Sequence, residues 1–230
     1  RRGLYNQTHF EITDNTTWYF KGLYNEREST NQAAPEPIFL GPEAGTGNAY
    51  ADNIFISRTN PYNPFGIDFI STGPDANLIF FGRRPIEGGA RVFNQEVDTW
   101  YIATGFEGNF DLGARKLYWD LNYANSQNKA EQTNYGSYNI RRIAQALGPV
   151  DACNADPNCV PLNYFGGQGA GGGTITPEML AYIQPIIRDS SEQELELYSA
   201  NLTGDLFELP AGALAFAAGY EYREYSGSYQ

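Results

Sequence analysis

Two segments of this chain alternate large apolar residues with polar ones, so that each has one apolar face. In residues 117–123, every second side chain is apolar, beginning at Leu117 and passing through Trp119 and Leu121. Residues 214–222 repeat the pattern. A period of two indicates β-strands, because successive side chains point to opposite faces of a sheet. Aromatic rings stand towards the ends of these apolar bands, which predicts a band about as tall as a bilayer core.

The same alternation marks further strands along the chain. We expect strands over about 4–12, 17–27, 91–110, 115–132, 192–209 and 213–225. The turns near Asp14, Asp111 and Pro210 are short, whereas the other connections, about 28–90 and 134–189, are long. Short turns at one end and long loops at the other are typical of outer-membrane barrels. The predicted fold class is therefore all-β, an antiparallel transmembrane β-barrel segment with long extracellular loops that contain short helices.

The alternation also assigns the side chains to two environments. The residues expected to face lipid are Trp18, Trp100, Trp119, Leu121, Phe216 and Tyr220. The residues expected to face the barrel lumen are Lys21, Asp120, Asp205, Glu221 and Arg223. In 192–209, Leu202 and Leu206 are assigned to the apolar face. A mean hydropathy of -0.47 is compatible with this scheme, because lumen-facing positions and loops dilute the lipid-facing half of each strand.

The apolar faces continue as polar residues at the loop end of the strands. Glu192, Glu194 and Glu196 extend one such face, and Glu96 and Asp98 extend another. The strands are therefore expected to leave an apolar slab and enter water. The three glutamates also have the spacing in which a glycosidase could place an acid and a base. A solvated strand extension is the simpler interpretation.

The second long loop carries two predicted helices and two cysteines. Apolar residues recur at helical spacing over 140–147, and Thr176 followed by Pro177 is a helix-start signal. The only histidine of the chain is His9, so Cys153 and Cys159 lack the partners of a structural zinc site. We expect a disulfide between them and an oxidising compartment.

Several functional classes are disfavoured by composition and motifs. A net charge of -12 argues against nucleic-acid binding, because nothing would neutralise the phosphates in bulk. Residues 167–172 match the dinucleotide pattern G-x-G-x-x-G, but they lack the strand before and the helix after it that the pattern needs, so we interpret them as a flexible glycine loop. No nucleophile–histidine arrangement or metal site is evident. We expect no enzymatic activity, no catalytic residue, no metal and no cofactor.

The first long loop concentrates aromatic and arginine residues. We consider Tyr62, Phe65, Arg83 and Arg84 candidates for binding a small ligand, because loops on rigid scaffolds often carry binding function. The alternative, equally supported by the sequence, is that these side chains pack the loop against itself.

Six segments together resemble the β-barrel of TonB-dependent outer-membrane receptors of Gram-negative bacteria. They are STNQAAPEP (29–37), NPYNPFG (60–66), CVPLNYFG (159–166), ITPEML (175–180), SANLTGDLFELPAG (199–212) and GYEYR (219–223). The resemblance implies a 22-stranded barrel with a plug in its lumen, which imports a siderophore, cobalamin or an oligosaccharide. It also implies the outer membrane as location and, as partners, the TonB system through the plug, outer-membrane lipid and lipopolysaccharide, and the remainder of the same barrel.

Six strands are fewer than the eight of the smallest barrel, so we expect the chain to be an internal portion of a longer polypeptide. Two alternatives remain open at this point. One is a secreted β-sandwich module that binds or cleaves glycans. The other is a general porin without a plug.

Overall fold

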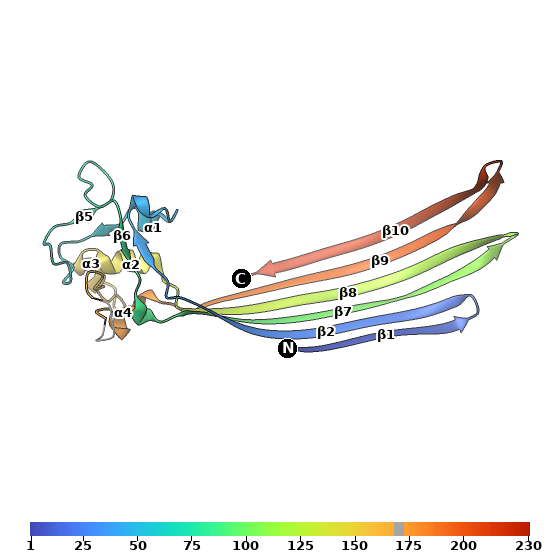
Figure 1. Cartoon of the computed structure of the whole chain (residues 1–230), viewed down its shortest axis with the longest axis horizontal. Helices are drawn as coiled ribbons and strands as arrows, with labels where there is room; N and C mark the ends of the chain where they lie inside the picture. Colours follow the sequence, from blue (N-terminus) through green and yellow to red (C-terminus); the bar gives the residue numbers. More distant parts are fainter. Residues whose placement is uncertain (168–172) are drawn as a thin grey trace. The chain divides into compact units, whose positions relative to one another are not determined.

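The computed structural model describes residues 1–167 and 173–230, and these form two compact units (Figure 1). The first, here called the sheet unit, comprises Arg1–Ser29, Gln95–Gln132 and Asp189–Gln230. The second, here called the loop unit, comprises Thr30–Asn94 and Thr133–Arg188. Each unit is thus assembled from segments far apart in the sequence.

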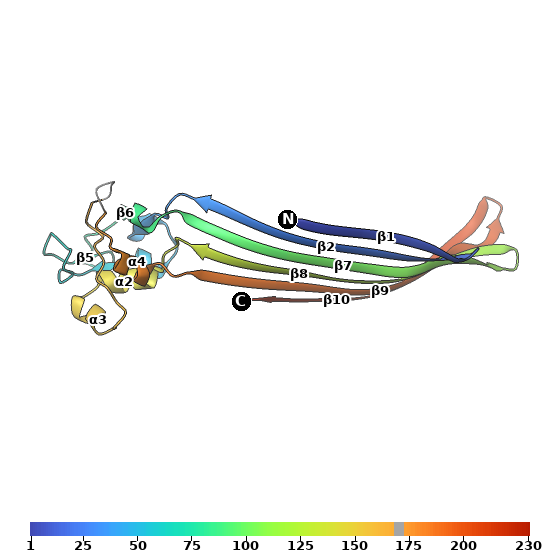
Figure 2. The ribbon, with the colours of Figure 1, turned by 90° about the horizontal axis from the view of Figure 1, so that it is seen from below.

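The sheet unit is built on one six-stranded sheet with the order β1-β2-β7-β8-β9-β10. Its strands lie side by side in a single curved layer (Figure 2). The pairs β1–β2 and β9–β10 are antiparallel. The strands are β1 (Arg2–Thr13), β2 (Thr16–Ala33), β7 (Arg91–Leu112), β8 (Arg115–Tyr135), β9 (Ile187–Leu209) and β10 (Gly212–Tyr229).

Three tight turns join these strands in pairs, at one end of the sheet (Figure 1). They are Asp14-Asn15, Gly113-Ala114 and Pro210-Ala211. Gly113 has a φ of 67°, in the left-handed region that a residue with a Cβ adopts at a cost. The turns occur where the sequence predicts them.

Several strands are longer than the alternation indicates. β2 continues to Ala33, β8 to Tyr135 and β10 to Tyr229, while β9 already begins at Ile187. Backbone hydrogen bonds between strands continue through segments whose side chains are polar on both faces. Because these segments lack alternating apolar residues, the hydrophobic pattern does not identify them as strand. The pattern therefore reports the apolar part of each strand rather than its full length.

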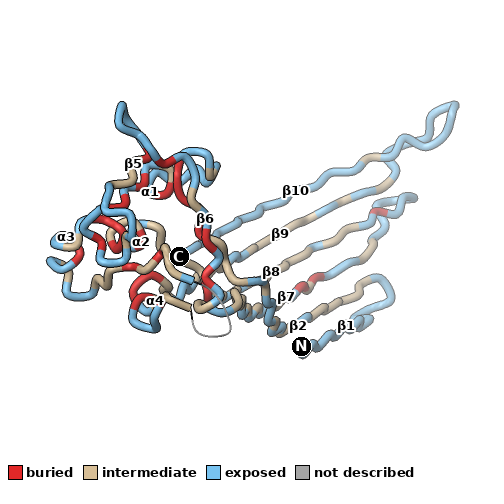
Figure 3. Tube along the Cα trace, turned by 60° about the vertical axis from the view of Figure 1, so that its left-hand side comes forward, coloured by how far each residue is buried: buried red, intermediate tan, exposed pale blue. Residues whose placement is uncertain are grey.

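The loop unit folds around a hydrophobic core of its own. Figure 3 shows its buried positions in red, and fully buried side chains include Leu40, Ile143, Leu162 and Ile183. Its elements are β3 (Ile38–Leu40), 3-10 helix η1 (Pro42–Ala44), α1 (Ala49–Asp52), β4 (Phe55–Ile56), β5 (Phe69–Ile70), β6 (Phe81–Arg83), 3-10 helix η2 (Ile86–Gly88), α2 (Ile140–Leu147), α3 (Val150–Asn154) and α4 (Pro177–Ile183). The connections that the sequence presents as two long loops therefore form one packed body.

Both predicted helices of the second connection are present, and their caps explain their limits. The Asn139 side chain accepts a hydrogen bond from the Arg142 N–H at the start of α2. Thr176 caps α4 by accepting from the Met179 N–H. α4 ends at Ile183, two residues before Pro185, whose ring is incompatible with a continuing helix. Within the described residues, no helix is long and apolar enough to cross a membrane.

The predicted disulfide between Cys153 and Cys159 is confirmed, with the two sulfurs 2.03 Å apart. Cys153 lies in α3, and the turn between the cysteines carries Asp156. The bridge therefore closes a short loop beside α2.

Candidate functional site

One face of the sheet is apolar through its middle. Residues opposite one another in register share a face, so Trp18 lies with Phe10 on one side of β1 and β2. The Trp18 indole N–H donates to Thr104 Oγ1 at 2.8 Å, which places Thr104 of β7 on the same side. The rings of Tyr123 and Tyr198, 4.9 Å apart, connect β8 to β9 there. We call this side the apolar face.

The six residues predicted to contact lipid lie on the apolar face by strand alternation and register. Within the sheet unit, Tyr220 keeps 69% of its surface exposed and Leu121 keeps 49%, and the other four side chains are partly exposed. Large uncovered apolar areas are unusual on a soluble monomer. The apolar face therefore presents exposed apolar side chains within the sheet unit.

A bulge in β9 modifies this face near its turn. The register of β9 and β10 shifts between Leu214 and Ala215, where Leu214 opposes Phe207 and Ala215 opposes Asp205. The extra residue in β9 is Leu206, and Phe207, which opposes Leu214, joins the apolar face. The alternation in the sequence does not indicate this bulge, because an extra residue in one strand leaves the local pattern unchanged.

The opposite side, the polar face, is cross-linked by side-chain hydrogen bonds. The Tyr19 hydroxyl donates to Asn122 Oδ1 at 2.5 Å. Asn122 Nδ2 in turn donates to Ser199 Oγ at 3.1 Å and to Asp120 Oδ2 at 3.2 Å, and Asn201 Nδ2 donates to the same Asp120 oxygen at 2.6 Å. These contacts join β2, β8 and β9 into one network.

The other residues predicted to face a lumen belong to the polar face as well. The Lys21 ammonium lies 5.6 Å from the centre of the Tyr19 ring. Arg223 and Glu221 form an ion pair at 2.8 Å, and Asp205 pairs in register with Ala215. The sheet thus separates an apolar face from a charged and hydrogen-bonded one.

Away from the turns, the apolar face becomes polar. The Trp100 indole N–H donates to Gln127 Oε1 at 2.9 Å, and Gln127 Nε2 donates to Glu192 and, at 3.0 Å, to Glu194. Ser226 also donates to Glu194. Trp100 therefore stands at the boundary between the apolar band and its carboxylate-rich extension.

The negative charge of the chain resides in the sheet unit. Of the 27 acidic and 15 basic residues, 18 acidic and 8 basic belong to the sheet unit, which gives it a net charge of -10. The loop unit holds 9 acidic and 7 basic residues and is close to neutral, at -2.

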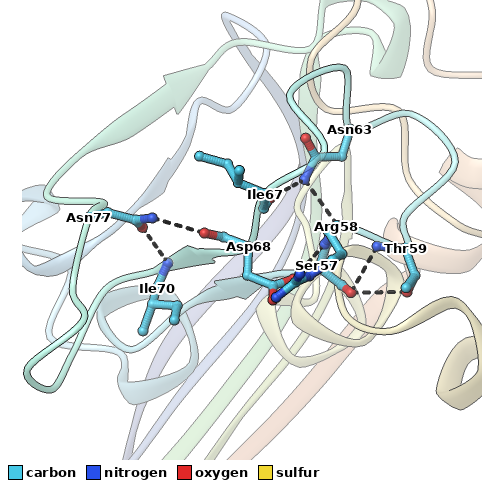
Figure 4. Close-up of polar contacts among 8 residues, drawn as sticks. All are labelled: Ser57, Arg58, Thr59, Asn63, Ile67, Asp68, Ile70 and Asn77. Atoms are coloured by element: carbon cyan, nitrogen blue, oxygen red, sulfur yellow. Dashed lines mark hydrogen bonds and ion pairs between the residues drawn. The ribbon is translucent and has the colours of Figure 1, made fainter.

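In the first long connection, an ion pair and two asparagines organise residues 57–77 (Figure 4). Arg58 donates to Asp68 from its backbone N–H at 2.7 Å and from its guanidinium at 2.9 and 2.6 Å. These hydrogen bonds lower the pKa of the Asp68 carboxyl. Asn63 donates to the carbonyls of Ser57 and Ile67. The segment is thereby closed on itself.

Two consecutive Asn-Pro turns present the candidate ligand-binding aromatics. Asn60 Oδ1 accepts from the Tyr62 N–H at 2.9 Å, and Asn63 Oδ1 accepts from the Phe65 N–H at 3.0 Å. Asn60 is buried and also donates to the Ala146 carbonyl. Phe65 is 62% exposed and Tyr62 38%, so both remain accessible to a ligand.

Arg83 has a different environment from the other candidates. Its guanidinium is enclosed and donates to the carbonyls of Asn163 and Tyr164 and to Glu87 Oε1, at 2.9, 3.2 and 2.5 Å. Packing of the loop therefore accounts for the position of the Arg83 side chain, whereas Arg84 is exposed.

The glycine motif falls largely on residues 168–172, outside the described residues. Among the residues that are described, none form a metal-binding group of three or more His, Cys, Asp or Glu side chains.

The structure also reveals a cleft that the sequence does not indicate. It has a volume of about 700 Å3 and lies between α2, the disulfide turn and α4. The Tyr182 hydroxyl donates to Gln145 Oε1 at 2.9 Å, and Gln145 Nε2 donates to Asp156 Oδ2 at 3.1 Å, so one side chain from each segment meets here. Only tertiary packing brings these residues together.

Comparisons of this chain with protein-family models, with curated proteins and with solved structures found no match.

Proposed function

We propose that the chain forms a section of the barrel wall of a TonB-dependent transporter in the Gram-negative outer membrane. The apolar face contacts lipid, and the carboxylate-rich extension meets the lipopolysaccharide headgroups. The polar face lines the lumen, where a plug couples import to the TonB system. The assignment to a TonB-dependent transporter rests on the six sequence segments that resemble that family.

The observation that carries the membrane part is the contrast between the two sides of a single-layer sheet. The apolar face is uncovered at Leu121 and Tyr220, while the polar face carries the Tyr19–Asn122–Asp120 network. In a barrel wall, outward apolar and inward polar residues alternate in this way. A secreted sandwich would cover the apolar face with a second sheet of similar size. The two other described sheets have strands of only two or three residues.

Two neighbouring alanines of β10 provide a matched test of the face assignment. Ala218 opposes Leu202 on the apolar face and Ala217 opposes Thr203 on the polar face; both are exposed. In phospholipid vesicles, Ala218→Arg is expected to lower the free energy of unfolding by about 2–4 kcal/mol, because the guanidinium would enter hydrocarbon. Ala217→Arg is expected to change it little.

The measurement is denaturant unfolding of the protein in vesicles, with wild type and both variants compared under the same conditions. Equal costs for the two arginines would contradict the assignment of lipid to the apolar face. The transporter assignment is tested separately, by measuring whether uptake of a siderophore, cobalamin or an oligosaccharide depends on the TonB system.

A further inference from the structure

The cleft of the loop unit has the size and rigidity of a ligand site. Its volume of about 700 Å3 lies inside the range of about 300–1,000 Å3 that is usual for small-molecule pockets. Its walls are held by hydrogen bonds, since Arg142 Nη1 donates to the Tyr182 carbonyl at 2.9 Å and the Tyr182 hydroxyl reaches Gln145. The Cys153–Cys159 bridge closes the turn that carries Asp156.

The charges around the cleft cancel. Arg141 and Arg142 face it together with Asp156 and Glu178. Backbone and side-chain donors, first the Asn158 N–H, lower the pKa of Asp156, and the Thr176 hydroxyl lowers that of Glu178, so both carboxylates are ionised at neutral pH. An anionic ligand would meet two carboxylates and a cationic ligand two guanidiniums. The balance favours a neutral ligand.

The polar groups of the cleft include both donors and acceptors. Guanidinium and amide N–H groups donate, while carboxylate and amide oxygens accept. A hydroxyl group does both at once, so a ligand with many hydroxyls matches such a lining better than one with only donors or only acceptors. Neutral sugars have this chemistry.

An apolar pocket adjoins the polar one at α2. It has a volume of about 390 Å3, and Gln145 lines both pockets. Tyr50, Phe55 and Pro149 line the apolar pocket, and the first two are 52% and 37% exposed. Flat apolar rings suit the C–H face of a sugar, which has hydroxyls around its edge.

We propose that the two pockets together bind a neutral oligosaccharide. One sugar unit bonds through its hydroxyls to the polar pocket, and a neighbouring unit lies against Tyr50 and Phe55. This proposal names the substrate class of the transporter and rests on the proposed function only for the import step. It places the site on α2 rather than on Tyr62 and Phe65.

Isothermal titration of the purified full chain tests the proposal. The detergent is a non-glycosidic amine oxide, because a maltoside headgroup would itself compete. The probes are maltohexaose, cellohexaose and chitohexaose, with hexagalacturonate as an anionic comparator and spermine as a cationic one. At least one neutral hexaose is expected to bind, and neither charged comparator is expected to bind as tightly. Binding of none of the three hexaoses, or tighter binding of a charged comparator, would overturn the proposal.

Variants locate the binding on α2. Arg141→Ala and Tyr50→Ala alter exposed side chains and are each expected to weaken hexaose binding at least tenfold. Arg188→Ala, an exposed arginine that lines neither pocket, is the matched control and should leave binding unchanged. Unaltered binding in both cleft variants, or an equal loss in Arg188→Ala, would overturn the assignment.

Failure of this proposal is distinguishable from failure of the transporter proposal. Hexaose binding with equal costs for the two alanine-to-arginine variants would refute the membrane assignment and support the cleft. Unequal costs without hexaose binding would refute the cleft and leave the membrane assignment standing.

Discussion

At the scale of single residues, Gly105 shows how the polar face achieves its close packing. Gly105 is buried within the sheet, and the Tyr19 ring lies over it to reach Asn122. A Cβ at this position would overlap the Leu121 carbonyl oxygen and the Tyr19 ring. The missing side chain is therefore what allows β2 and β8 to connect across β7.

We predict that Gly105→Ala lowers the free energy of unfolding by about 1–3 kcal/mol, the usual cost of overpacking. The Tyr19–Asn122 hydrogen bond should be displaced, because the ring must move. Denaturant unfolding in vesicles measures the loss. Gly3→Ala is the control, since its Cβ would meet neighbours only at 3.7 Å. A Gly105→Ala variant as stable as Gly3→Ala would contradict the packing.

A second residue-scale prediction concerns Arg58 and Asp68. Hydrogen bonds from Arg58 lower the Asp68 pKa, so this carboxyl contributes stability above its ordinary pKa of about 3.9. That contribution is lost as the pH falls through the depressed value. Protection against amide exchange in residues 57–77, expressed relative to the intrinsic exchange rate at each pH, should fall over this acidic range in wild type, whereas Asp68→Asn should show low protection already at neutral pH. The same exchange profile in both proteins would exclude this role for the pair.

At the scale of elements, the position of a strand and the position of a turn are held by different means, as the β9–β10 hairpin and the disulfide loop show. β9 stays paired with β10 on both sides of a bulge, and the bulge places Phe207 opposite Leu214. The disulfide instead holds a turn without regular structure and keeps Asp156 within reach of Gln145.

We predict that replacing both cysteines, Cys153→Ser with Cys159→Ser, lowers the stability of the loop unit by about 2–3 kcal/mol, as expected for closing a short loop. Hydrogen exchange in the turn around Asp156 should increase as well. Mass spectrometry of exchange, with and without a reductant, measures both effects. Reduced wild type is the matched control and should behave like the double variant. Unchanged protection of the turn would show that hydrogen bonds alone hold it.

At the scale of the whole molecule, the two units are stabilised by different means. The loop unit has a buried core that includes Tyr164, whose hydroxyl donates to the carbonyls of Ile38 and Phe81. In the sheet unit most side chains are exposed or half-buried, so this unit depends on its backbone ladder and, in our proposal, on lipid. Two bodies with separate sources of stability are expected to unfold separately.

We therefore predict two denaturant transitions in vesicles. Tyr164→Ala removes a buried ring and should lower only the loop-unit transition, by about 3–5 kcal/mol. Hydrogen exchange followed by mass spectrometry resolves the two units peptide by peptide. Phe106→Ala, an exposed position of the apolar face, is the comparison for the sheet. A single transition that both variants shift equally would contradict separate unfolding.

Most of the sheet was predictable because alternation is a local signal. One face of β8 can be recognised from neighbouring residues alone, namely Leu117, Trp119 and Leu121. The short turns then limit which strands can pair as hairpins. The helix start at Thr176 and the Cys153–Cys159 bridge were predictable for the same reason, since their partners lie within a few residues. The strand extensions beyond the apolar band carried no such signal.

The loop unit could not be predicted in this way. Its strands have two or three residues, too few to show a period, and its core joins residues from two segments separated by β7 and β8. Arg83 illustrates the consequence: in the sequence it is a candidate ligand contact, and in the structure its partners are carbonyls about eighty residues away. The cleft beside α2 also could not be predicted, because its residues come from segments that are distant in the sequence.

The sequence by itself determined the period, the faces, the turns and the disulfide, because each depends on neighbours along the chain. Only the tertiary structure decided that the long connections share a core, that Phe207 takes its place beside Leu214, and that Gln145, Asp156 and Tyr182 meet at one cleft. The physical reason is that burial and hydrogen-bond satisfaction are settled between distant segments, where no local pattern records the partner.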